Sequence, residues 1–270
     1  MHLALRIAYD GSQFDAYARD RDLYTVEGVL LEALRREGLV EHSFKTGSRT
    51  DARVSALENV VSCKLDRPHL KGIVHRIQNH LPIGIWVTAA TPVPDDFVPR
   101  YHAIRSYEYH AASRGESLDV MQAACALFEG EKDMRGFARV EAPRNPVRII
   151  KECRVEQAGE FWKFTIASPG FLWNQVRRMV DAMLRIGRGE IPLEAIEATL
   201  ASGVPHPNFK LAPAEGLLLR AVRYPDLTWD PICGQLNWDR IQRGRQSAVV
   251  HASLMDNLSK QALPRKPNRR

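Results

Sequence analysis

The chain has 270 residues, of which 44% are hydrophobic and 26% are charged, and it carries a formal net charge of +6 at pH 7. These proportions are typical of a globular protein and exclude collagen-like, mucin-like and wholly disordered chains. No apolar run approaches the ~18 residues that a membrane-spanning helix needs. The N-terminus also turns polar too soon for a secretory signal, so we expect a cytoplasmic protein without membrane segments.

The positive charge is concentrated near the C-terminus. Residues 1–226 hold 30 Lys and Arg against 29 Asp and Glu, whereas residues 227–270 hold eight against three. A basic end favours a polyanionic partner such as nucleic acid, although a solvated tail that contacts nothing explains the charge equally well. The cysteines stand far apart, without a CxxC pair or zinc-ligand spacing, which predicts free thiols and no metal ion at Cys63, Cys125, Cys153 and Cys233.

In chain order, alternating apolar residues first predict a half-buried strand at residues 3–9. Apolar residues at helical spacing then follow Thr25, a good N-cap residue, and Gly38 ends that helix. The remaining elements of the first hundred residues are strands at 43–47, 59–65 and 84–90 and a helix at 69–80. Their order is β-α-β-β-α-β.

The rest of the chain repeats this order. Its predicted elements are a strand at 106–112, a helix at 118–130, strands at 147–157 and 161–167 joined as a hairpin, a helix at 172–187 and a strand at 217–224. Because β-α-β-β-α-β is the ferredoxin-like order, we expect an α+β fold of two such units. They should form a mostly antiparallel sheet with helices on one side and a cleft between the halves, and they could join edge to edge or back to back.

Three segments follow from this pattern. We expect an N-terminal ferredoxin-like subdomain at residues 1–103, a second one at 104–226, and a basic extension at 227–270. A helix at about 247–260 is possible within the extension, and its last residues have the composition of a disordered end.

The segment from Gly47 to Arg53, GSRTDAR, lies between two predicted strands and should form a surface loop. Loops held by a rigid sheet often carry reactive groups. Asp51 stands between Arg49 and Arg53, and a neighbouring cation favours the ionised carboxylate. The alternative is an ordinary turn stabilised by its aspartate.

The helix at 172–187 has an apolar stripe that should face a core, formed by Leu172, Val176, Met179, Val180 and Met183. On the opposite side, Arg178, Arg185 and Arg188 should be solvated or contact phosphate. Arg177 lies about 100° from the centre of the stripe, at the border of the buried surface. There its guanidinium needs a carboxylate or phosphate partner, unless it reaches solvent along its aliphatic stem.

Tyr107 and Tyr109 share one face of the strand at 106–112. An aromatic ring on a sheet face can stack against an unpaired nucleobase, but it is also an ordinary strand residue.

Six motifs follow one another along residues 1–226: YDGSQF (9–14), GSRTDA (47–52), LP (81–82), RYHAIRSY (100–107), FLWNQVRRMV (171–180) and EGLLLRAVRYP (215–225). In this order they resemble the TruA family of tRNA pseudouridine synthases. Two places depart from the family pattern. Arg53 to Ala56 read R-V-S-A where the family has G-V-H-A, and Ala16 to Ala18 replace its Gly-Trp/Tyr-Gln. The first matters most if Arg53 must adopt a positive φ, which favours glycine.

The resemblance implies an enzyme that isomerises uridine to pseudouridine in the anticodon stem-loop of tRNA, around positions 38–40. It also implies a homodimer that needs no metal or cofactor. Asp51 would be the catalytic nucleophile, paired with Arg177; whether it attacks the base or the sugar, or removes a sugar proton, stays open. Tyr107 would stack on the uracil and handle the C5 proton, Arg49 would fill the gap left by the extruded nucleotide, and Leu219 would press the base from the other side.

Two other functions fit parts of the sequence. One is a non-catalytic RNA-binding protein of the same fold, which the changes after Asp51 would allow. The other is an acid–base or metal-dependent hydrolase that uses Asp10 and Asp51. No second carboxylate stands near Asp51 in the sequence and no histidines cluster, so Asp10 is better explained as a residue that stabilises the first turn.

Overall fold

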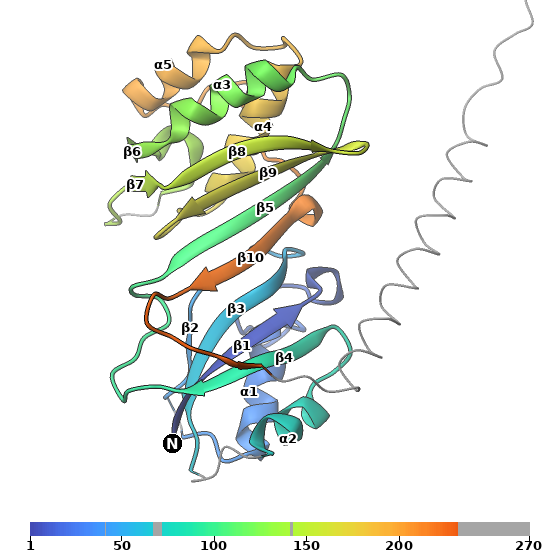
Figure 1. Ribbon diagram of the computed structural model, residues 1–270, viewed down its shortest axis with the longest axis vertical. Coiled ribbons are helices and arrows are strands. Elements are labelled where there is room, and N and C mark those ends of the chain that lie inside the picture. The colour runs from blue at the N-terminus through green and yellow to red at the C-terminus, as the bar shows by residue number, and fades with distance from the viewer. Residues whose placement is uncertain (41, 67–71, 141–142, 232–270) are drawn as a thin grey trace, which may run out of the picture. The chain divides into compact units, whose positions relative to one another are not determined.

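The computed structural model describes residues 1–231 except 41, 67–71 and 141–142 (Figure 1). The first half contains β1 (His2–Tyr9), α1 (Val26–Arg36), β2 (Lys45–Thr46), β3 (Ser55–Lys64), α2 (Ile73–His80) and β4 (Ile85–Pro92). The predicted order β-α-β-β-α-β is confirmed. Cys233, the helix predicted at 247–260, and the predicted start of the second helix at 69 lie outside the described residues.

The second half repeats the order with β5 (Ile104–Ala112), α3 (Leu118–Phe128), β8 (Glu152–Ala158), β9 (Phe161–Ser168), α4 (Gln175–Gly187) and β10 (Leu217–Arg223). It also contains β6 (Gly130–Asp133), β7 (Val147–Ile150), α5 (Glu194–Ser202) and β11 (Asp230–Pro231). The single strand predicted at 147–157 is wrong. Lys151 separates β7, which pairs with β6 in a small sheet of its own, from β8, which pairs with β9. The predicted hairpin is confirmed, and Gly159 turns the chain there with a φ of 64°.

The two halves share one sheet. Its strands lie in the order β11-β4-β1-β3-β10-β5-β9-β8, with β2 paired to β3 (Figure 1). All pairs in the sheet are antiparallel except β3 with β10, whose register joins Ser55 to Leu218 and Ala56 to Leu219. This parallel pair connects the halves edge to edge, which decides between the two arrangements that the sequence left open. The fold is therefore of the α+β class with a mostly antiparallel sheet.

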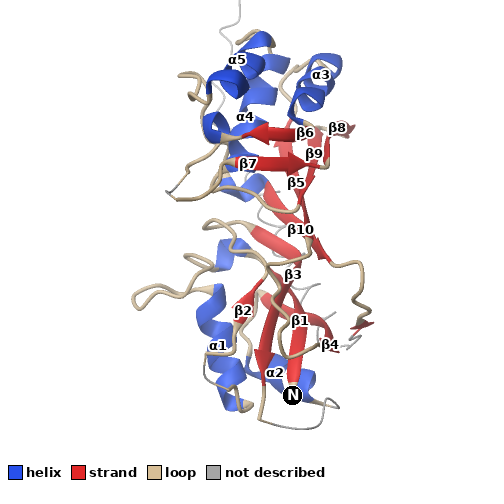
Figure 2. Cartoon of the chain, turned by 90° about the vertical axis from the view of Figure 1, so that its left-hand side faces the viewer, coloured by secondary structure: helices blue, strands red, loops and turns tan. Residues whose placement is uncertain are grey.

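The helices begin and end where the sequence provides signals for it. The Thr25 hydroxyl accepts a hydrogen bond from the N–H of Gly28 (3.1 Å), and Gly38 follows α1 with a φ of 81°. α1 packs against α2, and α3 packs against α4. Figure 2 shows α1 and α4 on the same side of the sheet.

β1 is more buried than its alternating pattern predicts. Leu5 and Ile7 are fully buried as expected, but so is Ala4, and only Arg6 is partly exposed. β1 is paired on both edges, and the segment leading to β11 crosses it in Figure 1. The ring centroid of Trp229 lies 4.5 Å from the Arg6 guanidinium. The prediction of a half-buried strand was wrong, and Trp229, from the far end of the described chain, packs on Arg6 on the face of β1 that alternation left exposed.

Among the described residues, the cysteines are free and buried, at Cys63, Cys125 and Cys153. No helix in this part of the chain is both long enough and apolar enough to cross a membrane. Residues 1–231 form one compact unit. A division of that unit near residue 103 stays a prediction.

Candidate active site

The loop between β2 and β3, here called the Asp51 loop (residues 47–54), has a fixed backbone. The N–H of Gly47 donates to the carbonyl of Val60 (2.7 Å), which continues the pairing of β2 with β3. The N–H of Val54 donates to the carbonyl of Asp51 itself (3.2 Å) and closes a turn. The Asp51 carboxylate is therefore presented from a rigid segment.

The opening motif packs against the end of this loop. A Cβ on Gly11 would lie 2.3 Å from the carbonyl oxygen of Val54, so only glycine allows the two segments to approach so closely. The N–H of Gly11 donates to the hydroxyl of Ser55 (3.0 Å). The Asp10 carboxylate accepts hydrogen bonds from the N–H (3.0 Å) and hydroxyl (2.7 Å) of Ser12. Asp10 thus stabilises the first turn, as the sequence predicts.

Asp51 and Arg177 meet across the two halves of the chain. Nη1 of Arg177 donates to Oδ2 of Asp51 at 3.0 Å, and Nε donates to the carbonyl of Ala212 at 2.7 Å. The side chains are only 14% exposed for Arg177 and 20% for Asp51. The neighbouring Val176 and Met179 are buried, which places Arg177 at the border of the core. Arg177 therefore has the carboxylate partner that its position in the helix predicts.

Tyr107 projects from β5 into the same region and is buried. Its hydroxyl lies 3.0 Å from the hydroxyl of Ser48 in the Asp51 loop. Its ring meets Phe171 edge to face, with centroids 5.3 Å apart. Burial raises the pKa of the Tyr107 phenol, so the hydroxyl is neutral and able to donate a hydrogen bond near neutral pH.

A cleft of about 930 Å³ contains these groups and is lined by both halves of the chain. Asp51, Arg177 and Tyr107 line it, and Arg49 lines it with a side chain that is 64% exposed. The structure does not bring Leu219 to the cleft: its side chain is fully buried, and Leu217 lines the cleft instead. The described part of the chain has no group of three or more His, Cys, Asp or Glu residues that could hold a metal ion.

Arg105 is a central residue of the site to which the sequence argument assigned no role. Its guanidinium is buried and donates through Nε (3.2 Å) and Nη2 (2.8 Å) to the carbonyl of Gly47, at the start of the Asp51 loop. It also donates to the carbonyls of Arg100 and Pro169. Burial lowers the pKa of Arg105. Arg105 thus ties three segments together, and its position on the same strand face as Tyr107 was the available signal.

The departure of Arg53 from the family pattern has a structural account. Arg53 adopts a φ of 66°, which confirms that this position needs the left-handed region where glycine is preferred. Its Nε lies 2.6 Å from Oε1 of Glu215, which precedes β10. Both side chains are more than half exposed, so the ion pair offsets only part of the backbone strain.

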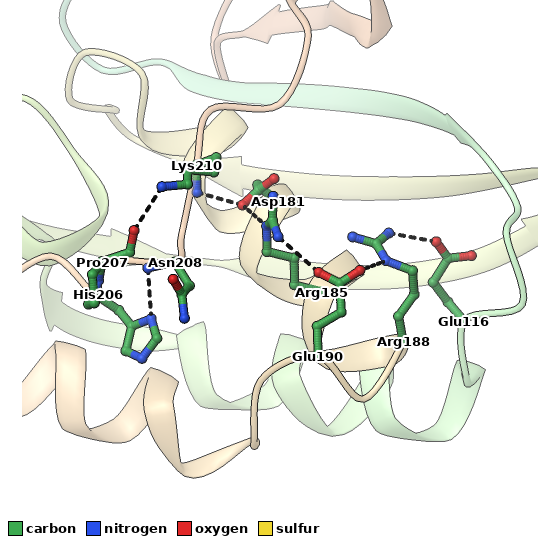
Figure 3. Close-up of polar contacts among 9 residues, drawn as sticks. All are labelled: Glu116, Asp181, Arg185, Arg188, Glu190, His206, Pro207, Asn208 and Lys210. Carbon is green, nitrogen blue, oxygen red and sulfur yellow. Dashed lines mark hydrogen bonds and ion pairs between the residues drawn. The ribbon is translucent and has the colours of Figure 1, made fainter.

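Two of the three arginines on the far side of α4, Arg185 and Arg188, are not as predicted. Arg185 donates to Asp181 (3.0 Å) and Glu190 (2.8 Å), and Arg188 contacts Glu190 and Glu116 (Figure 3). Both guanidiniums are therefore paired with carboxylates, and their side chains are only 28% and 24% exposed. Helical periodicity predicts which side of α4 faces away from the core. It does not show that Glu190, just after the helix, and Glu116, just before α3, supply carboxylates on that side.

Asp181 links this network to the cleft. Its carboxylate accepts a hydrogen bond from the backbone N–H of Lys210 at 2.6 Å, in addition to the one from Arg185 (Figure 3). Lys210 stands two residues before Ala212, whose carbonyl holds Arg177. α4 therefore positions Arg177 twice, directly through its backbone and indirectly through the segment that Asp181 anchors.

A partly buried carboxylate–guanidinium pair lies beside a tyrosine in a cleft lined by two ferredoxin-like halves, which is the arrangement of an active site that receives part of its substrate in the cleft. The family model for tRNA pseudouridine synthase matches residues 124–225, which contain α4 and β10. Proteins named tRNA pseudouridine synthase A from Thermococcus kodakarensis and Thermococcus gammatolerans are 36% and 38% identical to this chain. The first alignment covers 85% of this chain and 87% of the relative, and the second covers 84% and 86%.

A third relative of the same name, from Pyrococcus horikoshii, is 33% identical over 96% of this chain and its own full length. The chain belongs to the tRNA pseudouridine synthase A family. Among solved structures, a crystal structure of the archaeal box H/ACA sRNP Nop10-Cbf5 complex is similar at 16% identity and a TM-score of 0.34, over 67% of this chain and 44% of that one.

Proposed function

We propose that this protein isomerises uridine to pseudouridine in the anticodon stem-loop of tRNA, around positions 38–40. The observation that carries the proposal is the 3.0 Å contact between Asp51 and Arg177, inside a cleft of a chain that belongs to this family. A cleft of about 930 Å³ is large enough to accept a single extruded nucleotide.

In this proposal Asp51 supplies the catalytic carboxylate, and Arg177 holds it in place and balances its charge. The bond between C1′ of the ribose and N1 of the uracil breaks, the base turns in the cleft, and a bond from C1′ to C5 forms. N1 then takes up a proton, and the hydrogen at C5 leaves as a proton, so the product is an isomer of the substrate. The buried hydroxyl of Tyr107 is neutral and lies 3.0 Å from the hydroxyl of Ser48. In this proposal it orients the base and assists the proton transfer.

The rim of the cleft supports the rest of the proposal. Arg49 is exposed there and its long cationic side chain can occupy the space that the extruded nucleotide leaves in the RNA. Leu217, and not Leu219, borders the space in which the base would lie. We further propose that two copies act as a homodimer, which sedimentation or light scattering of the pure protein would test.

The direct test of the function is mass-spectrometric mapping of pseudouridine in unmodified tRNA incubated with the pure protein. We expect conversion of uridines at positions 38–40 without added metal or cofactor. Salt-sensitive tRNA binding without pseudouridine in any transcript would contradict the proposal and favour a non-catalytic RNA-binding protein. Conversion outside the anticodon stem-loop would retain the reaction and overturn the proposed target.

Asp181→Ala should slow this reaction although Asp181 does not line the cleft. The substitution removes the acceptor for the Lys210 N–H and loosens the segment that holds Arg177. We expect kcat to fall about 10-fold and the free energy of unfolding to fall by about 2 kcal/mol. Asp181→Asn keeps one oxygen acceptor and should recover most of the rate.

The matched control is Glu190→Ala, which breaks contacts to Arg185 and Arg188 in the same network but none to the 206–212 segment. Its single-turnover rate should stay near that of the unmodified protein. Equal effects of Asp181→Ala and Glu190→Ala on the rate would show that only general stability is involved.

A further inference from the structure

Trp173 is a large aromatic residue that the proposed chemistry does not use. It lines the cleft and the residue is 42% exposed, although Leu172, directly before it, and Gln175, two residues after it, are buried. Asn174, the next residue, adopts a φ of 64° at the N-terminus of α4. Asparagine tolerates this conformation better than most residues. The local backbone therefore buries its neighbours while leaving Trp173 at the cleft surface.

Arg139 holds the indole in one orientation. Its guanidinium carbon lies 4.3 Å from the centroid of the Trp173 ring, a cation–π contact that covers one ring face. The backbone N–H of Arg139 also donates to the carbonyl of Trp173 at 3.0 Å. An exposed indole that is fixed by a cation on one face offers its remaining surface with little loss of side-chain freedom on binding.

Two further arginines line the same cleft: Arg144 from the segment that joins β6 to β7, and Arg148 from β7 itself. Arg148 donates to the carbonyls of Asn145 (2.7 Å) and Val147 (2.6 Å), and Arg144 lies close enough to add to the lowering of the Arg148 pKa that burial causes. Neither arginine has a carboxylate within ion-pair distance among the residues that the structure describes. By contrast, Arg185 and Arg188 are fully paired. An anion between Arg144 and Arg148 would relieve their repulsion.

We propose that Trp173 stacks against the nucleobase adjacent to the extruded uridine, and that Arg144 and Arg148 bind the phosphates of that stretch of RNA. This inference rests on the proposed function, because the strand that delivers a uridine to Asp51 must pass the other residues lining the cleft. Extruding one nucleotide leaves its neighbours without a stacking partner, and aromatic side chains recognise unstacked bases in this way. Trp173 replaces the stacking that the neighbour loses.

Binding can be measured without turnover in an Asp51→Asn background, using an unmodified anticodon stem-loop RNA with a fluorescent end label. Trp173→Ala should weaken binding about 5- to 150-fold, the range for losing one base–aromatic stack. Trp173→Phe keeps an aromatic ring and should recover most of the affinity. The control is Phe161→Ala, which removes an aromatic side chain of similar exposure, 50%, that does not line the cleft.

A second measurement identifies the base. The RNA is made with one abasic nucleotide at a time on either side of the target uridine. One of these RNAs should bind the Asp51→Asn protein as weakly as the Trp173→Ala protein binds intact RNA. When that RNA is combined with the Trp173→Ala protein, the affinity should fall no further. Separately, Arg144→Ala and Arg148→Ala should each reduce the slope of log Kd against log salt concentration by about one.

The stacking role would be overturned if the Trp173→Ala protein bound intact RNA as tightly as the protein with Trp173. It would also be overturned if the loss of affinity caused by Trp173→Ala added fully to the loss caused by each of the two abasic RNAs. Such a result would leave the proposed function intact as long as the unsubstituted protein forms pseudouridine. Absence of pseudouridine would instead remove the proposed function, and the binding measurements would still report whether Trp173 contacts a base.

Discussion

Asp51→Asn should abolish pseudouridine formation while leaving the fold and tRNA binding intact. The substitution changes one oxygen to an amide nitrogen without changing the size of the side chain. An oxygen remains to accept the hydrogen bond from Arg177 at 3.0 Å. The amide can neither form a covalent intermediate as a carboxylate does nor accept a proton near neutral pH. We expect the rate to fall by about 10³-fold or more.

Release of tritium from tRNA labelled at C5 of uridine measures the reaction directly, because the C5 hydrogen is lost whenever the base is rejoined through that carbon. Asp10→Asn is the matched control: it makes the same change in the neighbouring loop, where the carboxylate only holds the turn at Ser12. Its rate should stay within a few-fold of wild type. Turnover by Asp51→Asn at the control rate would remove Asp51 from the chemistry.

Each half of the contact between Asp51 and Arg177 has a local signal, but it was the resemblance to the family that paired the two residues. Asp51 follows a short strand in a loop, and the helical period places Arg177 beside an apolar stripe, where a guanidinium needs a partner. The order of helices and strands is equally local. How the halves join depends instead on β3 pairing with β10, whose residues are far apart in the sequence, and no periodicity reports such a pairing.

The leucines of β10 show why the wall of the cleft was harder to predict. Leu217 and Leu219 lie on the same face of the strand, so alternation does not separate them. Leu219 is opposite Tyr107 in the register and lies wholly within the core, whereas Leu217 is at the strand end that opens into the cleft. Whether a residue at a given position along the strand lies in the core or lines the cleft depends on the segments packed around it. The sequence pattern of the strand does not report this. Alternation did place Arg105 on the same strand face as Tyr107, but it could not show that the Arg105 guanidinium reaches the carbonyl of Gly47, a residue 58 positions away in the chain.

Arg177→Met should reduce activity and stability together, and adding Asp51→Asn should restore only the stability. Methionine keeps much of the apolar stem but leaves the Asp51 carboxylate, 20% exposed, without its cation, and it leaves the Ala212 carbonyl without a donor. Removing one partner of a fully buried pair costs about 3–5 kcal/mol. Because water reaches this pair in part, we expect a loss of about 1–3 kcal/mol in the free energy of unfolding.

Urea unfolding of the wild type, the two single variants and the double variant gives the coupling between the residues. We expect the double variant to be at least about 1 kcal/mol more stable than the sum of the single effects, since a neutral asparagine no longer needs a cation. Arg185→Met is the control from the same helix: its partners are Asp181 and Glu190, so its effect should add to that of Asp51→Asn. Additivity for Arg177 as well would mean that the 3.0 Å contact contributes nothing to stability and that Arg177 acts through its bond to Ala212 alone.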